Sequence, residues 1–296
     1  MQDIRSVGVI GAGQMGSGIA QVAAVAGLGV ALYDAAPGAV AKAREGHAKR
    51  LAREVEKQRL AKADSEAALA RIRPAESLDA LAACDIVIEA IVEDAGVKRE
   101  LFARLARLFP AERAGPAGPV ILASNTSSIS ITEIAGAVGP AGAPERVIGM
   151  HFFNPVPVMK LVEVIRGLAT SEATTARVVA LARAMGKTPV PANDRPGFVS
   201  NRVLMPMINE AFFAWMEGVA EPEHIDEIMK LGCNFPMGPL RLADFIGLDT
   251  CLHILGVLHR ELGDPKYRPC PLLRQLVAAG RLGDKAGRGV FAYPGS

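Results

Sequence analysis

The sequence predicts an α/β domain with a doubly wound, mainly parallel sheet, followed by an all-helical domain. Up to about residue 187, short apolar runs alternate with longer segments of helical spacing, which is typical of parallel strands covered on both faces by helices. A segment with three prolines follows at 188–196, and proline cannot continue a helix. Beyond it the apolar spacing is helical. We therefore place the first domain at 1–187 and the second at 188–296.

The elements of the first domain follow from this alternation. The apolar runs that predict strands are, in chain order, Ser6–Ile10, Gly29–Tyr33, Asp85–Ile91, Val120–Ser124, Val147–Phe152 and Leu161–Ile165. The segments that predict helices are Met15–Ala26, Ala39–Lys62, Val97–Leu108, Ile129–Val138 and Ser171–Met185. The segment from about 39 to 72 is long enough to project from the domain as a helical hairpin.

The second domain shows two apolar faces at helical spacing. One is formed by Val203, Met207, Ile208, Ala211 and Trp215, and the other by Ile225, Ile228, Met229 and Leu231.

Composition excludes several classes of protein. The 296 residues carry a formal net charge of +2 and only 5% aromatic side chains, which argues against nucleic acid as a partner. The four cysteines show no CxxC spacing, so we expect free thiols in a reducing cytoplasm and no metal site. The uncharged stretch from Ser6 to Tyr33 resembles a membrane span, but its seven glycines argue against that interpretation and for a soluble protein.

A glycine motif links the first predicted strand to the first predicted helix. It reads Gly11-Ala12-Gly13-Gln14-Met15-Gly16, the spacing at which a tight turn brings backbone and a helix N-terminus to a dinucleotide diphosphate. Asp34 ends the second strand, where an acid accepts hydrogen bonds from ribose hydroxyls and repels a 2′-phosphate. The motif therefore predicts a Rossmann-like domain that binds NAD rather than NADP. The alternative is a glycine-rich loop beside a solvated acid.

Two later strands end in polar residues. Ser124-Asn-Thr-Ser-Ser128 follows one strand, at the edge where open α/β sheets bind ligands. Ser127 or Ser128 could alternatively cap the helix expected from Ile129. His151 ends the next strand, and Glu163 lies within the apolar run after it.

Glu163 and His151 are a candidate catalytic pair. A lone histidine on an apolar strand is more often structural, but a carboxylate inside such a strand is costly unless it is paired. If the two strands are neighbours, Glu163 can hold one ring nitrogen and stabilise the protonated imidazole, which suits a general base.

Taken together, the motifs resemble those of the L-3-hydroxyacyl-CoA dehydrogenase family, and within it the bacterial 3-hydroxybutyryl-CoA dehydrogenases, over essentially the whole chain. The matching segments are Gly11–Gly16, Asp34, Glu89–Asp94 with Lys98, Ser124–Ser128, His151–Lys160, Glu163, Arg195–Arg202 and Leu231–Pro239.

The resemblance implies NAD-dependent, reversible oxidation of an (S)-3-hydroxyacyl-CoA to the 3-oxoacyl-CoA. It implies that His151 is the general base and that Glu163 orients it. The other implied roles are Ser127 and Asn201 on the substrate's 3-oxygen, Asn154 beside the reacting groups, Glu93 and Lys98 on the nicotinamide ribose, and Asp34 on the adenosine ribose, with Gln14 and Met15 in the cofactor loop.

The coenzyme A portion of the substrate has separate support. Eight basic and three acidic residues lie between Lys42 and Lys62, a local charge of +5, which suits the phosphates of CoA. The resemblance assigns Lys57 to that contact; the alternative is a solvated helix face.

Two other functions are compatible with these motifs: a related dehydrogenase of polyol acids such as gulonate, and a non-catalytic NAD-binding structural protein. The basic segment favours CoA over a small free acid, and the presence of both His151 and Glu163 favours catalysis. The resemblance also implies a homodimer, formed through helical faces at Leu204–Trp215 and Leu252–Leu262.

Overall fold

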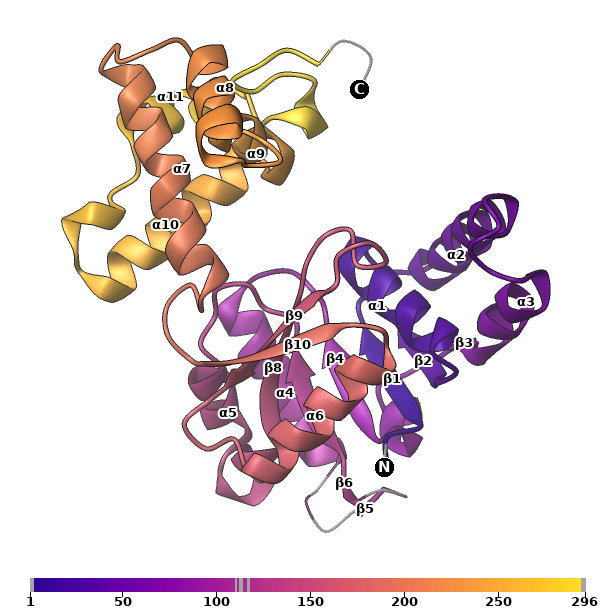
Figure 1. Ribbon diagram of the computed structural model, residues 1–296. Helices are drawn as coiled ribbons and strands as arrows, with labels where there is room; N and C mark the ends of the chain where they lie inside the picture. The colour runs from indigo at the N-terminus through magenta and orange to yellow at the C-terminus, as the bar shows by residue number, and fades with distance from the viewer. Residues whose placement is uncertain (1–2, 110, 112–113, 116–117, 294–296) are drawn as a thin grey trace. The chain divides into compact units, whose positions relative to one another are not determined.

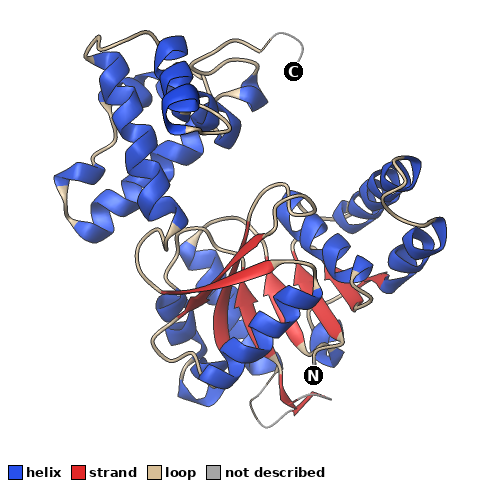
Figure 2. Ribbon diagram, viewed as in Figure 1, coloured by secondary structure: helices blue, strands red, loops and turns tan. Residues whose placement is uncertain are grey.

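The computed structural model describes residues 3–109, 111, 114–115 and 118–293, and the chain forms two compact units, Met1–Asp194 and Arg195–Ser296 (Figure 1). Each unit has its own hydrophobic core. The first is an α/β unit and the second is helical (Figure 2), as the sequence predicts.

An eight-stranded sheet with the order β10-β9-β8-β7-β4-β1-β2-β3 forms the centre of the first unit. Its strands are β1 (Ser6–Ile10), β2 (Gly29–Tyr33), β3 (Ile72–Pro74), β4 (Ile86–Glu89), β7 (Ile121–Ser124), β8 (Val147–Phe152), β9 (Leu161–Arg166) and β10 (Thr188–Asn193). All neighbours are parallel except β8 and β9. A separate pair, β5 (Ala114–Gly115) and β6 (Gly118–Pro119), is antiparallel.

Helices cover this sheet because its central strands are apolar on both sides. Every residue of β4, β7 and β8 is buried, and burial of such runs is the main favourable term in folding. The helices of the unit are α1 (Gln14–Val25), α2 (Ala39–Glu56), α3 (Lys62–Arg71), α4 (Ala95–Leu108), α5 (Ile131–Val138) and α6 (Glu172–Ala184). Short 3₁₀ turns lie at Asp79–Ala83, Pro140–Gly142 and Pro144–Arg146.

The helical stretch expected over Ala39–Lys62 is interrupted, because the chain turns inside it. α2 ends at Glu56, and Gln58 has a φ of +56°, in the left-handed region that interrupts a helix. α3 begins at Lys62 and packs back against α2. Figure 1 shows the two as a hairpin at the β2–β3 side of the sheet, which is the projecting element expected at 39–72.

The boundary between the units lies later than the expected break at 187. Residues 188–193 form β10, which pairs in parallel with β9, and the second unit begins at Arg195. The prolines are compatible with a strand here because β10 is at the edge of the sheet, where one side of the strand needs no ladder hydrogen bonds. The proline-rich segment therefore belongs to the sheet and not to a linker.

The second unit contains α7 (Ser200–Met216), α8 (Pro222–Cys233), α9 (Pro239–Ile246), α10 (Leu248–Leu262) and α11 (Pro271–Ala278), with 3₁₀ turns at Pro265–Tyr267 and Asp284–Ala286. Asp244 in α9 anchors the C-terminal segment, because its carboxylate accepts hydrogen bonds from the backbone of Val290 and Phe291 and from the Tyr293 hydroxyl. In the part of the chain that the structure describes, no single helix is long and apolar enough to span a membrane. The helices α9 and α10 together have sufficient length and apolar composition, but the chain bends by 98° between them.

The two apolar faces expected in this unit are only partly buried. In α7, Ile208 and Ala211 are in the core, but Val203 is exposed. In α8, Ile228 and Leu231 are exposed, at 63% and 78%. The core of this unit is filled from α7, α9, α10 and α11 by residues such as Met205, Phe212, Leu240 and Leu255.

Candidate active site

The glycine motif forms the tight turn that its spacing predicts. Gly11 has a φ of +101°, and a Cβ there would lie 2.5 Å from the carbonyl oxygen of Ala90. A Cβ on Gly16 would lie 1.9 Å from the carbonyl oxygen of Gly11. Gly13, by contrast, faces open space, and α1 begins after it without a side-chain cap. The helix N-terminus is therefore accessible to an anionic group.

A cavity of about 730 Å³ adjoins this turn. Gly11, Gly13, Gln14, Met15 and Asp34 line it, together with residues 90–92 after β4 and one face of α4. Asp34 is fixed by its backbone neighbours: its carboxylate accepts hydrogen bonds from the amides of Ala12 at 2.7 Å and Ala36 at 2.8 Å. An open helix N-terminus and an acid at the end of β2 fit the diphosphate and ribose of a dinucleotide.

His151 and Glu163 form a buried pair across the only antiparallel contact of the described eight-stranded sheet. They are directly opposite each other in the register of β8 and β9, and His151 Nδ1 lies 2.8 Å from Glu163 Oε2. The residues are 7% and 3% exposed. A carboxylate at Nδ1 selects the tautomer that carries a proton there and stabilises the imidazolium. Nε2 is then the ring nitrogen suited to exchange a proton with a substrate.

The loop after His151 is tied to the cofactor turn. Gln14 Nε2 donates a hydrogen bond to Asn154 Oδ1 at 2.9 Å, and α1 approaches the loop so closely that a Cβ on Gly18 would lie 2.8 Å from the Cβ of Val156. From the other side, the amide of Phe152 donates to Asn125 Oδ1 at 2.9 Å. The structure thus brings Gln14 and Asn154 together beside the strand that carries His151.

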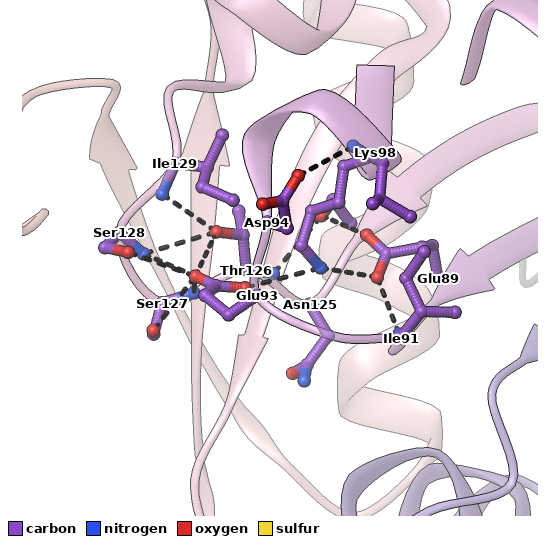
Figure 3. A network of polar contacts seen from close by, with 12 residues as sticks. Glu89, Ile91, Glu93, Asp94, Lys98, Asn125, Thr126, Ser127, Ser128 and Ile129 are labelled. Atoms are coloured by element: carbon purple, nitrogen blue, oxygen red, sulfur yellow. Dashed lines mark hydrogen bonds and ion pairs between the residues drawn. The ribbon is translucent and has the colours of Figure 1, made fainter. Parts of the chain in front are cut away.

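The serine-rich segment folds around Glu93 and does not form a helix cap. Oε1 of Glu93 accepts hydrogen bonds from the Thr126 hydroxyl at 2.6 Å and from the amides and hydroxyls of Ser127 and Ser128 at 2.8–3.1 Å (Figure 3). Burial favours a higher pKa for Glu93, but Lys98 and these donors hold its pKa below the usual value. Glu93 is therefore a carboxylate that organises the segment containing Ser127.

Ser130 caps α5, with its hydroxyl accepting from the Glu133 amide, and the helix begins at Ile131. The alternative that Ser127 or Ser128 caps a helix from Ile129 is therefore wrong, since both serines are turned to the Glu93 carboxylate.

Lys98 is buried, whereas the implied contact with a ribose would require an accessible ammonium. It is 1% exposed, and its Nζ lies 2.5 Å from Glu89 Oε1 and 3.3 Å from Glu93 Oε2. An ammonium buried between two carboxylates has its donors directed to protein atoms. In this structure Lys98 is an internal counter-ion of Glu89 and Glu93, and its contact with a ribose stays a prediction.

The basic hairpin contributes to a second cavity of about 810 Å³. Lys57 follows the last residue of α2 and lines it, as do Arg50 and Lys160. Arg50 is held in place by hydrogen bonds to Gln21 Oε1 at 2.7 Å and Ser17 Oγ at 2.9 Å. This cavity suits a polyanion.

Asn201 lies at the start of α7 in the second unit, where it is buried.

Sequence reasoning missed the parts played by Glu89 and Asn125. Glu89 ends the apolar strand Ile86–Glu89 and is 0% exposed. The argument that singles out Glu163, a carboxylate inside an apolar run, applies to Glu89 equally. Asn125 gave no such signal, because asparagine is common in any loop that follows a strand.

Comparisons with known proteins agree with this geometry. Residues 6–195 match the 3-hydroxyacyl-CoA dehydrogenase NAD binding domain, and residues 197–293 match the C-terminal domain of the same family. The chain is 58% identical to a probable 3-hydroxybutyryl-CoA dehydrogenase of Bacillus subtilis, covering 98% of each. It is 50% identical to a 3-hydroxybutyryl-CoA dehydrogenase of Bradyrhizobium diazoefficiens, covering 99% of this chain and 97% of that one. The crystal structure of (S)-3-hydroxybutyryl-CoA dehydrogenase from Ralstonia eutropha matches with a TM-score of 0.91 at 52% identity, over 98% of this chain and 99% of that one.

Proposed function

Since this chain belongs to the 3-hydroxyacyl-CoA dehydrogenase family, we propose that its substrate is a short-chain (S)-3-hydroxyacyl-CoA such as 3-hydroxybutanoyl-CoA. The enzyme is an NAD-dependent oxidoreductase that interconverts 3-hydroxyacyl-CoA and 3-oxoacyl-CoA. The short chain length is supported by the names of its relatives. The His151–Glu163 pair is the observation that carries the chemistry.

His151 performs the proton transfer in this proposal. Its Nε2 takes the proton of the 3-hydroxyl while the C3–H bond breaks, and Nδ1 stays hydrogen-bonded to Glu163 Oε2. Glu163 stabilises the imidazolium that results. NAD held at the glycine turn and Asp34 would supply the acceptor for the hydride that leaves C3. In the reverse direction His151 returns the proton to the 3-oxygen, so that charge and atoms balance.

The remaining polar residues orient the reactants. We assign Ser127 and Asn201 to the 3-oxygen and Asn154 to the nicotinamide side, beside Gln14. Glu93 is assigned to the nicotinamide ribose, and Asp34 to the adenosine ribose, where its carboxylate disfavours a 2′-phosphate. Such placement converts a bimolecular encounter into a reaction between oriented groups.

The cavity at the basic hairpin is assigned to the CoA portion of the substrate, with Lys57 as a phosphate contact. Its basic lining supports this assignment. A small free acid such as gulonate would leave that cavity without use.

A comparison of substrates and cofactors in one spectrophotometric assay tests the proposal. NADH oxidation is followed with 3-oxoacyl-CoA substrates of increasing chain length, then with NADPH, and in the oxidative direction with gulonate and NAD. We expect the highest kcat/KM for acetoacetyl-CoA with NADH. A preference for gulonate would indicate the polyol-acid reaction, and NADH binding without turnover of any substrate would indicate a structural protein.

We also propose a homodimer formed through the second unit, in a reducing compartment such as the cytoplasm. Leu204, Trp215, Leu252 and Leu262 are only partly buried within the unit, so the faces at Leu204–Trp215 and Leu252–Leu262 stay candidates for the interface. The exposed apolar residues Val203, Ile228 and Leu231 are further candidates for contact with a second copy. All four cysteines are free, which suits a reducing compartment.

A further inference from the structure

A buried acid lies at the end of β4, next to the serine-rich segment, and the mechanism above does not use it. Glu89 Oε1 accepts hydrogen bonds from Lys98 Nζ at 2.5 Å and from the Ile91 amide at 2.7 Å. Glu89 Oε2 accepts from the Ser124 hydroxyl at 2.6 Å. Figure 3 shows the Glu89 carboxylate beside Lys98 and Ile91. Burying a carboxylate is costly, so a site that is fully enclosed and fully hydrogen-bonded requires an explanation.

Lys98 is shared between two carboxylates. Its Nζ lies between Glu89 and Glu93, closer to Glu89 by the distances of 2.5 and 3.3 Å. The start of α4 is fixed by Asp94, whose side chain accepts from the Val97 amide. The backbone of Lys98 is therefore fixed by the capped helix, and its ammonium is held by Glu89.

Glu93 uses its other oxygen to hold the serine-rich segment. Oε2 faces Lys98, while Oε1 accepts from Thr126, Ser127 and Ser128. The direction of the Glu93 carboxylate thus depends on how strongly Lys98 attracts Oε2. If Lys98 lost its pairing with Glu89, the ammonium would be free to move to Glu93 and draw its carboxylate away from Ser127, because unlike charges attract strongly where water is excluded.

We propose that Glu89 is a positioning residue for Ser127, acting through Lys98 and Glu93. Glu89 retains the ammonium of Lys98, and Glu93 in consequence keeps Oε1 directed to the segment that carries Ser127. The inference rests on the proposed function, in which Ser127 binds the 3-oxygen of the substrate.

Asp85 supplies a matched control, because it is a second buried acid at the opposite end of the same strand. It is 2% exposed, and its Oδ2 accepts hydrogen bonds from the amides of Arg5 and Ser6 and from the Ser6 hydroxyl. These partners lie at the beginning of β1, at the opposite end of the sheet from Ser127. Asp85→Asn therefore disturbs a comparable buried site without touching the serine-rich segment.

The test is a double-mutant cycle between Glu89→Gln and Ser127→Ala, with kcat for acetoacetyl-CoA reduction and the NADH Kd as readouts. We expect Glu89→Gln to lower kcat by about tenfold in the wild-type background and by less than about twofold in the Ser127→Ala background, since residues acting through one another are not additive. Asp85→Asn should lower Tm and change kcat by less than about twofold.

An equal effect of Glu89→Gln in both backgrounds would overturn the inference, as would a folded Glu89→Gln enzyme with wild-type kcat. If Glu89→Gln does not fold, Glu89→Asp keeps the charge but shortens the side chain that reaches Lys98, and it enters the same cycle with the same criteria. A wild-type enzyme inactive on acetoacetyl-CoA would instead contradict the proposed function, so the two failures are distinguishable.

Discussion

His151 Nδ1 and Glu163 Oε2 are 2.8 Å apart, and the two residues are paired across the antiparallel ladder of β8 and β9. Paired residues in such a ladder have Cβ atoms only about 5 Å apart. The distance between base and acid is therefore set by the backbone of two buried strands. A base held in this way is ready for proton transfer without rearrangement of its surroundings.

Replacing His151 tests the base directly. We expect His151→Gln to lower kcat for acetoacetyl-CoA by about 10²- to 10⁴-fold, the usual contribution of general acid–base catalysis. NADH binding, measured by fluorescence titration, should stay near the wild-type value, since the glycine turn and Asp34 are unchanged. Wild-type turnover by the variant would exclude the histidine from the mechanism.

Replacing Glu163 tests the partner. Glu163→Gln removes the charge that stabilises the imidazolium, so kcat should fall by about tenfold or more, the equivalent of 1.4 kcal/mol. Glu172→Gln is the control, because Glu172 pairs with Arg166 at the exposed end of β9 and is itself exposed. Its steady-state kcat should equal that of the wild type. Equal losses in the two variants would point to a general effect on the sheet.

Asp34 is expected to set the choice of cofactor. Asp34→Ala removes the acid that disfavours a 2′-phosphate, so the ratio of kcat/KM for NADH to that for NADPH should fall. It also leaves the amide of the buried Ala12 without its acceptor, which should cost about 1–3 kcal/mol of the free energy of unfolding. Kinetics with both cofactors and urea denaturation measure the two effects. An unchanged cofactor ratio would contradict this role.

His47 makes stability depend on pH. It is buried in α2, and its Nε2 contacts the carbonyl and hydroxyl oxygens of Ser17. Burial lowers its pKa from 6.5, and the charges of Arg50 and Arg44 lower it further, against the raising effect of the Ser17 carbonyl. The unfolded chain therefore takes up a proton near pH 6.5 that the folded chain does not, and stability is lost as the pH falls below that value.

Urea denaturation at pH 7.5, 6.5 and 5.5 measures this loss. In His47→Gln, the decrease in the free energy of unfolding between pH 7.5 and 5.5 should be smaller than in the wild type, because the titrating group is gone. An identical pH dependence would assign the effect to other groups.

The proposed dimer depends on the exposed apolar residues of α8. Introducing a charge there by Ile228→Glu with Leu231→Glu should yield a monomer in light scattering, because an unpaired charge is costly in an apolar interface. Leu168→Glu serves as the control, since Leu168 is 90% exposed but lies in the first unit. A dimer that survives the α8 changes would place the interface elsewhere.

Much of the fold could be predicted because its strands are continuous apolar runs between glycines or polar residues. β1, β2 and β8 have the bounds predicted for them. β10 was missed, since its prolines exclude only a central strand and the sequence does not show which strand lies at the edge. Periodicity locates the apolar faces of α7 and α8 but does not show what covers them.

The candidate site likewise contains residues that could be predicted from the sequence and residues that could not. His151 and Glu163 could be predicted as a pair, because a buried acid needs a partner and few were available. Lys98 could not be placed, since a lysine in the first turns of a helix is ordinarily solvated. Its burial follows from the meeting of Glu89 at the end of β4 with Glu93 in the loop that follows, an arrangement that no local pattern encodes.

The reversal of direction between β8 and β9 also determines which sequence changes this enzyme can tolerate. Side chains alternate between the two faces of a strand, so a shift of one residue in either strand would turn Glu163 to the opposite face from His151. An insertion or deletion within these strands, even of a residue as small as alanine, would separate the pair although every catalytic side chain was still encoded. The site is thus more sensitive to the length of the chain here than to the identity of the apolar residues around it.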